Sequence, residues 1–329
     1  MTHSAAETVS QQFDDYFDDF KIIRKQIQNF IWGQDQVIDL CLTSLLAGGH
    51  TVLVGLPGLG KTRLVRVLSQ VLGVETKRIQ CTPDLMPADI LGSEILSEDE
   101  NGQRHFRFIK GPVFCQLLMA DEINRASPRT QSALLEAMQE KQVTLAGHSH
   151  DLPHPFHVMA TQNPLEQEGT YPLPEAQRDR FLMQIDIGYP NQMDERKMVL
   201  ATTAGEEETP KCLFSSERLL DLQSLICTMP VGDAVLQAAL DLVHHLRPED
   251  SPHQDIRDYI EWAPGPRASQ ALIQTAKAYA MLQGRTAPSV EDIAFLAIPV
   301  LKHRMAVNLS ARAQGITVDN LIKQVITAQ

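Results

Sequence analysis

The stretch GLPGLGKT, residues 55–62, constrains the fold of this chain more than any other feature. It follows TVLVG (51–55), a short apolar, β-branched run typical of a strand that is buried on both faces. It precedes RLVRVLSQVLG (63–73), in which apolar residues recur at helical spacing. The order strand, glycine loop, helix indicates a phosphate-binding loop. In such a loop the backbone N–H groups and the positive end of the following helix converge on phosphate groups.

The octet fits the pattern G-x-x-x-x-G-K-[ST]. Lys61 is expected to pair with phosphate oxygens of a nucleotide, and Thr62 to hold Mg²⁺, although the loop alone does not separate kinases, GTPases and motor ATPases. A tight turn with a surface lysine is the simpler interpretation, but it does not account for the strand before the loop and the helix after it. The predicted nucleotide-binding residues of the loop are Gly55, Leu56, Pro57, Gly58, Leu59, Gly60, Lys61 and Thr62.

Strands and helices alternate through the first part of the chain, and helices alone fill the second. Alternation of this kind indicates an α/β fold with a parallel sheet covered on both faces. At 329 residues the chain has room for about two domains. We predict a leading amphipathic helix and an α/β core over 1–189, and a helical domain over 190–329. The further predicted strands are 77–82, 114–120 and 155–161, with a helix over 130–141.

Composition narrows the class of protein. Apolar residues make up 43% and charged residues 21%, as in ordinary globular proteins. A formal charge of -12 argues against a main surface for nucleic acid or anionic lipid. The five cysteines are scattered, which predicts neither a disulfide framework nor a zinc site. The acidic start of the chain does not resemble a secretory signal, and no apolar run reaches the ~20 residues of a membrane span, so we expect a cytoplasmic protein.

Two acidic residues follow another predicted strand. LLMADE (117–122) ends with Asp121 and Glu122, which places both side chains at the carboxyl edge of the sheet, where open α/β sheets bind ligands. Asp121 is expected to complete the Mg²⁺ shell, and Glu122 to accept a proton from the attacking water. The alternative is a helix N-cap followed by a surface acid, which is common after a strand.

Three more residues complete the predicted chemistry. Asn163 closes the next strand, where its amide would orient water against the γ-phosphate; by turn statistics alone it is a turn former before Pro164. Arg180 and Arg267 are candidates to stabilise transition-state charge. Taken singly, each arginine is also typical of a surface ion pair.

Several long stretches together resemble the MoxR family of AAA+ ATPases. They are GLPGLGKT, LLMADEINRA, TQSALLEAMQEKQVTL, ATQNPLEQEGTYPLPEAQRDRF and GPRAS, and they span nearly the whole chain. The resemblance implies that residues 55–62 are Walker A, Asp121 and Glu122 Walker B, Asn163 sensor 1, Arg180 the arginine finger for a neighbouring subunit, and Arg267 the sensor 2 arginine.

The resemblance also implies partners and pore elements. Such proteins form rings, usually hexamers, and bind ATP between the α/β domain and the helical lid. The segment IWGQDQVI (31–38), with Gln34, is similar to the lining of an adenine pocket. Hairpins at Asn101-Gly102 and around Gly147 resemble the helix-2 insert and the pre-sensor hairpin. Relatives are described as chaperone-like motors that assemble or activate partner proteins, often ones with von Willebrand factor A domains.

Two features depart from the family pattern. Arg178 stands near the expected finger in place of an apolar residue, so the roles of Arg178 and Arg180 are interchangeable on sequence alone. The second hairpin and the following strand carry His148, His150, His154 and His157. His148 and His150 share a strand face and so are candidates to chelate a metal, but solvated loop histidines are the favoured interpretation.

The overall hypothesis is ATP hydrolysis by in-line attack of water, completed by a neighbouring subunit. Three alternatives stay open: the ATPase subunit of a magnesium chelatase-like complex, a DNA-directed motor that tracks on Arg104, Arg107 and Lys110, and a scaffold that binds ATP without turnover. The acidic balance makes nucleic acid an unfavourable partner.

Overall fold

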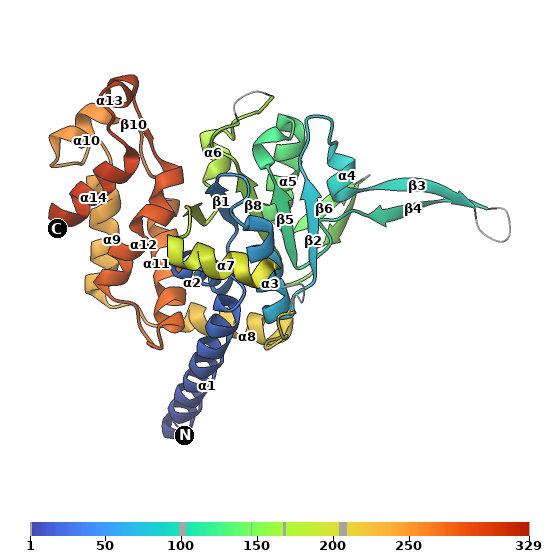
Figure 1. Cartoon of the computed structure of the whole chain (residues 1–329), viewed down its shortest axis with the longest axis horizontal. Coiled ribbons are helices and arrows are strands. Elements are labelled where there is room, and N and C mark those ends of the chain that lie inside the picture. The colour runs from blue at the N-terminus through green and yellow to red at the C-terminus, as the bar shows by residue number, and fades with distance from the viewer. Residues whose placement is uncertain (1, 99–102, 146, 167–168, 204–208, 329) are drawn as a thin grey trace.

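A five-stranded parallel sheet forms the centre of the molecule (Figure 1). The computed structural model describes residues 2–98, 103–145, 147–166, 169–203 and 209–328. The strand order is β2-β5-β8-β1-β9, which confirms the predicted α/β class. The strands are β1 (Thr51–Gly55), β2 (Thr76–Gln80), β5 (Leu117–Asp121), β8 (His157–Gln162) and β9 (Met183–Ile187).

Helices cover both faces of this sheet, which is why its inner strands β1, β5 and β8 are largely buried, whereas the edge strand β2 carries exposed polar residues. Along β1, Leu53 packs into the hydrophobic cluster that contains α1, α2 and α3, whereas Val52 packs into the cluster that contains α5. Successive side chains of a strand point to opposite faces, so a strand covered on both sides has no polar face. The helices are α1 (Thr2–Gln28), α2 (Asp35–Leu46), α3 (Lys61–Leu72), α4 (Pro87–Leu91) and α5 (Pro128–Glu140).

The chain after residue 189 is mainly helical, as predicted, and lies largely to one side of the sheet (Figure 1). A small antiparallel pair, β10 (Ile260–Trp262) and β11 (Ala306–Val307), was not predicted. The division at 189 and 190 stays a prediction, because α11 and α12 share a continuous core with α2. The helices are α7 (Gln192–Thr203), α8 (Ser216–Thr228), α9 (Asp233–His245), α10 (Gln254–Tyr259), α11 (Pro266–Leu282), α12 (Val290–Leu301), η2 (Lys302–Arg304), α13 (Leu309–Ala313) and α14 (Val318–Ala328).

No single helix among the described residues is long and apolar enough to cross a bilayer. The pair α8 and α9 passes the same test only when taken together, with a 92° bend between them.

Two hairpins interrupt the alternation, as predicted. The first pairs β3 (Gly92–Glu98) with β4 (Arg104–Lys110) and projects from the body (Figure 1), while its predicted turn, Asn101-Gly102, lies outside the described residues. The second pairs β6 (Gln142–Leu145) with β7 (His148–Asp151).

The bounds of three predicted strands were wrong by one to three residues: β2 is Thr76–Gln80 where 77–82 was predicted, β8 is His157–Gln162 where 155–161 was predicted, and β5 also differs. The strand expected over 114–120 begins at Leu117, because residues 114–116 form buried turns before it. Burial alone does not separate a turn from a strand, and an apolar turn residue extends the pattern that predicts the strand.

Candidate nucleotide site

The loop after β1 has the open backbone that phosphate binding requires. Gly58 and Gly60 adopt φ values of +82° and +76°, in the region that favours glycine. A Cβ atom added to either would meet no atom within 4 Å, so the outer side of the loop is open. A Cβ at Gly55 would lie 2.7 Å from the carbonyl oxygen of Ile187, so close approach to β9 requires glycine there. These three glycines therefore have conformational reasons for their identities.

Lys61 begins α3, and its side chain folds back over the loop. Its ammonium group donates to the carbonyl oxygen of Gly55 and, at 3.2 Å, to that of Leu56. Burial lowers the pKa of Lys61, and the carboxylates of Asp121 and Glu122 oppose that shift. The ammonium group is therefore held at the loop carbonyls and is attracted by the acidic pair. Thr62, the next residue, is exposed at the first turn of α3.

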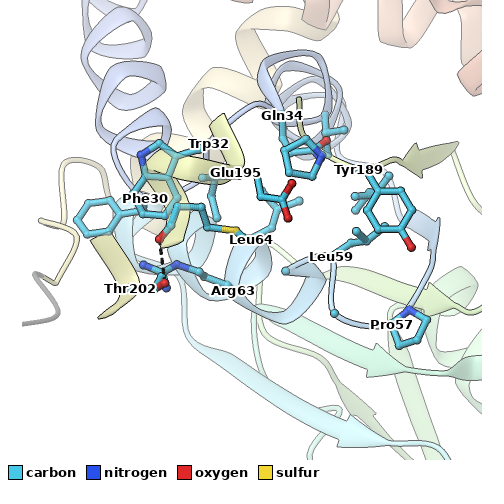
Figure 2. A pocket seen from close by; sticks show the side chains of 17 residues that line it. Phe30, Trp32, Gln34, Pro57, Leu59, Arg63, Leu64, Tyr189, Glu195 and Thr202 are labelled. Atoms are coloured by element: carbon cyan, nitrogen blue, oxygen red, sulfur yellow. Dashed lines mark hydrogen bonds between the residues drawn. The ribbon is translucent and has the colours of Figure 1, made fainter. Parts of the chain in front are cut away.

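A cavity of about 260 Å³ adjoins the loop (Figure 2). Its lining includes Gln34 and the predicted loop residues 57–60. The amide of Gln34 donates to the carbonyl oxygen of Gly188 at 2.8 Å, which fixes the 31–38 segment to the end of β9. Figure 2 shows Phe30, Trp32 and Arg63 toward one end of the cavity and Tyr189 and Pro57 at the other. An apolar pocket with aromatic walls and a few polar groups suits a nucleotide base.

Sequence reasoning missed one wall of this cavity. Helix α7 contributes Glu195, Met198 and Thr202, and it has no buried residue of its own. From residue 190 onward, the cavity is lined by Pro190 and α7. None of the described lining residues belongs to α8–α14. The cavity therefore lies between the α/β core and α7, and the helix that carries Arg267 does not line it.

Asp121 ends β5, and both of its oxygens are held. Oδ2 accepts from Arg78 Nη2 at 2.6 Å and from Nε at 3.1 Å, and Oδ1 accepts from the hydroxyl of Thr161. Arg78 lies on β2, the strand that pairs with β5. Contacts at both oxygens, from Arg78 on Oδ2 and Thr161 on Oδ1, fix the plane of the carboxylate. The partner arginine was not predicted, although its strand was.

Glu122 follows at the carboxyl edge with an unusual backbone. Its φ of +55° is rare for a residue other than glycine and is often found at functional sites. The carboxylate accepts from Gln80 Nε2 at 2.8 Å and from Arg125 Nη1 at 3.0 Å. The backbone N–H of Glu122 donates to Thr161 Oγ1 at 2.9 Å, so one threonine orients both acidic residues.

Sequence alone held a weak signal for the partners on β2. Arg78 and Gln80 are two residues apart on β2 and so lie on the same strand face. The Arg78 guanidinium donates a hydrogen bond to the amide oxygen of Gln80 at 2.9 Å. Strand order was needed to place that face beside Asp121 and Glu122.

Asn163 is buried directly after β8, at the same edge of the sheet. Its Oδ1 accepts from the backbone N–H of Leu165 at 3.2 Å, across Pro164. The turn-forming role considered from sequence is therefore present, and it fixes the amide plane at the edge where the acidic pair lies.

The predicted arginines lie together, but away from the cavity. Arg178 belongs to α6 (Glu175–Arg178), pairs with Glu175 at 3.8 Å and lies over the ring of Trp262 at 5.2 Å. Arg180 has no ion pair or side-chain hydrogen bond with any described residue. Arg267 Nη1 lies 3.5 Å from Asp179 Oδ2, in the same segment. None of these three arginines lines the cavity beside the loop.

The segment that carries Arg180 leads to the amino end of β9. The backbone N–H of Leu182 donates to the carbonyl oxygen of His50, directly before β1, at 2.7 Å. The phosphate loop starts at the other end of β1, at Gly55. The five residues of β1 therefore separate the Leu182 contact from the start of the loop by about 16 Å, at about 3.3 Å per residue.

The predicted histidine group is divided in the structure. His157 is buried, donates from Nδ1 to the carbonyl of Gly49 at 3.0 Å and contacts Gln223 at 3.1 Å, so its assignment as a solvated loop residue was wrong. His150 stacks on Phe108 at 4.1 Å and so joins the two hairpins. No group of three or more potential metal ligands occurs among the histidines, cysteines and acidic residues that the structure describes.

The basic residues of the first hairpin do not form one track. Alternate residues of β4 face opposite sides, so Arg107 points away from Arg104 and Lys110. Arg104 pairs with Glu98 at 3.7 Å, and Lys110 lies over the ring of Phe114 at 5.2 Å. This arrangement does not favour a DNA-directed motor, which needs cations aligned along a phosphate backbone.

Comparisons with known proteins agree with this geometry. Residues 50–183 match the ATPase family associated with various cellular activities (AAA), and residues 252–325 match the AAA lid domain. The chain is 39% identical to Chaperone MoxR1 of Mycobacterium tuberculosis over 92% of this chain and 79% of that protein. It is also 39% identical to the uncharacterized protein YeaC of Bacillus subtilis, over 92% of each.

A solved structure extends the likeness to three dimensions. The crystal structure of a candidate ATPase from Cytophaga hutchinsonii superposes with a TM-score of 0.90 at 35% identity, covering 98% of this chain and 97% of that one. Together with the relatives, it supports a nucleotide-binding ATPase with a chaperone-like role. The chain belongs to the MoxR family of AAA+ ATPases.

Proposed function

We propose that this ATPase is a Mg²⁺-dependent ring motor whose active sites form between neighbouring copies of the chain. In each site one copy supplies the loop, Asp121, Glu122 and Asn163. The adjacent copy supplies Arg180 and Arg267. Glu122 accepts a proton from water that attacks the γ-phosphate in line, while Asn163 orients that water.

The observation that carries this proposal is the position of Arg180. It has no partner among the described residues, and its segment joins the amino end of β9, one strand length from the loop. An arginine side chain does not extend across that distance to the phosphates of its own chain. An unpaired arginine on a neighbouring copy supplies the missing charge, and such a finger increases turnover by about 10³ to 10⁵.

The donor groups beside the loop fit Mg²⁺. This ion prefers oxygen ligands in octahedral geometry, and the exposed hydroxyl of Thr62 and the carboxylate of Asp121 are of that kind. Arg78 takes both acceptor positions of Oδ2 and Thr161 takes one of Oδ1, which leaves one lone pair of Oδ1 for the ion. When bound, Mg²⁺ neutralises charge on the β- and γ-phosphates.

The biological role that we propose is chaperone-like assembly or activation of partner proteins in the cytoplasm. The chain would act as a hexameric ring, and its partners would contain von Willebrand factor A domains. Support comes from membership of the family and from the relative named Chaperone MoxR1. The projecting β3–β4 hairpin supports contact with a partner. Its Leu96 and Phe106 pair across the strands and are 55% and 72% exposed.

Mixing two inactive variants tests the shared active site. K61A lacks a working loop, R180A lacks the finger, and each alone is expected to be nearly inactive. In a mixed ring, about one quarter of the interfaces join an intact loop to an intact finger, so activity should return. K61A mixed with the double variant K61A/R180A is the control and should stay inactive. If the K61A and R180A mixture is also inactive although gel filtration shows mixed rings, the shared site is excluded.

A further inference from the structure

Asp179, between Arg178 and Arg180, joins two arginines of the helical region. Its Oδ1 lies 2.8 Å from Arg304 Nε, and its Oδ2 lies 3.5 Å from Arg267 Nη1. The two partners differ in burial, because the side chain of Arg304 is 3% exposed and that of Arg267 is 58% exposed. The Asp179 carboxylate therefore connects a buried guanidinium, that of Arg304, to an exposed one, that of Arg267.

Arg304 attaches the helical region firmly to this segment. Its guanidinium donates to the carbonyl oxygen of Phe181 at 2.8 Å, to that of Leu182 at 3.1 Å, and to that of Val300. A buried guanidinium needs several acceptors and a counter-charge. The carbonyls meet the first need and Asp179 meets the second.

Asp179 is the only acidic partner of either cation among the described residues. Without its charge, Arg304 would be buried unpaired, and the positive charge of Arg267 would be repelled from it. The 3.5 Å contact is long and exposed, so it orients Arg267 without holding it tightly.

We propose that Asp179 is a positioning residue that holds Arg267 beside Arg180, so that both arginines meet the triphosphate of the neighbouring copy together. Helix α11, which starts at Pro266, is thereby coupled to the finger of the same chain. The inference rests on the shared active site proposed above. It predicts that the loss of Asp179 impairs hydrolysis in the adjacent copy and not in its own.

The test places D179N on one chain or the other of the complementing mixture. With K61A/D179N and R180A, the altered chain supplies the arginines, and turnover should fall about 10-fold to 100-fold below the K61A and R180A mixture, since small displacements of a positioned group have effects of that size. With K61A and R180A/D179N, the altered chain supplies only the loop, and turnover should match the parent mixture. Nucleotide affinity should be unchanged in both.

The same pair of mixtures separates the possible failures. Equal loss in both would mean that Asp179 only maintains the fold, and no loss in either would mean that it does not position Arg267; each result overturns the inference. An inactive parent mixture would overturn the shared site as well. If D179N does not fold, K61A/R267Q with R180A should show the loss in its place, because Arg267 is exposed. E175Q, on the other acidic residue of the segment, should have no effect in either position.

Discussion

The carboxyl edge of the sheet and the arginine segment, residues 175–182 directly before β9, differ in how their charges are balanced. At the carboxyl edge each acidic residue has its own cation, Asp121 with Arg78 at 2.6 Å and Glu122 with Arg125 at 3.0 Å. The charges there are matched within one chain, which holds the carboxylates in place.

The arginine segment, together with the two helical-region arginines that contact it, has more positive than negative charge. Four guanidinium groups meet two carboxylates, and the side chain of Arg180 has no described partner. The four are Arg178, Arg180, Arg267 and Arg304, and the two are Glu175 and Asp179. An excess of arginine suits a polyphosphate and an internally balanced edge suits a metal and a water, which supports our proposal that the two regions are complementary halves of one shared site.

The largest expected effect separates the two arginines of the segment. R180A should lower turnover by about 10³-fold or more while ATP still binds, because the transition state loses its cation. R178A should lower it far less, since Arg178 is occupied by Glu175 and Trp262. Steady-state turnover and equilibrium nucleotide binding of both variants are the measurements. The reverse order of effects would assign the finger to Arg178.

E122Q tests the chemistry at the carboxyl edge. The amide keeps a contact with Gln80 but cannot take a proton, so turnover should fall by about 10²-fold to 10⁴-fold while the ATP-bound ring persists. Single-turnover hydrolysis and light scattering in ATP measure the two properties. Retained function in a partner-activation assay would favour a scaffold that needs no hydrolysis.

R78M tests whether the balanced charge supports metal binding. Without the guanidinium of Arg78, Thr161 is the one side-chain hydrogen-bond partner that Asp121 keeps among the described residues. The Mg²⁺ concentration for half-maximal turnover should then rise by about 10-fold to 100-fold. K77M, on the same strand, is the control, because Lys77 pairs with Glu75 and donates to the carbonyl of Phe114. An unchanged Mg²⁺ requirement in R78M would remove the proposed role of the pair.

The smallest effect concerns the amino ends of β1 and β8, where His50 and His157 are buried. Burial lowers the pKa of His50 to about 3 and that of His157 to about 4. The unfolded chain binds these protons near pH 6.5, so the stability that neutral histidines give is full above that pH and decreases as the pH falls toward the folded values. Asp39, whose pKa burial raises to about 6, opposes this trend.

The free energy of unfolding should therefore fall between pH 6.5 and pH 4, by at most about 1.4 kcal/mol per pH unit for each histidine. Urea denaturation at several pH values measures the slope. H157Q should show a shallower slope than the unaltered chain, whatever its stability at neutral pH. An equal slope would show that His157 does not titrate as its burial indicates.

Local patterns predicted the fold well where one element decides the outcome. TVLVG became β1 at its predicted bounds because both of its faces are buried, and Asp121 and Glu122 reached the carboxyl edge because their strand ends there. The partners Arg78 and Arg304 were not predicted. Arg78 meets Asp121 through the pairing of β2 with β5, and Arg304 meets Asp179 across 125 residues of sequence. Such contacts depend on strand order and on packing between distant segments, which periodicity does not encode.

The most direct test of the shared site is a cryo-EM structure of the E122Q ring with ATP and Mg²⁺. The account predicts the triphosphate at residues 55–62, with the guanidinium of Arg180 from the adjacent copy at hydrogen-bond distance, about 2.7 to 3.2 Å, from the γ-phosphate. An occupied loop with Arg180 directed to solvent, or to the nucleotide of its own chain, would contradict it.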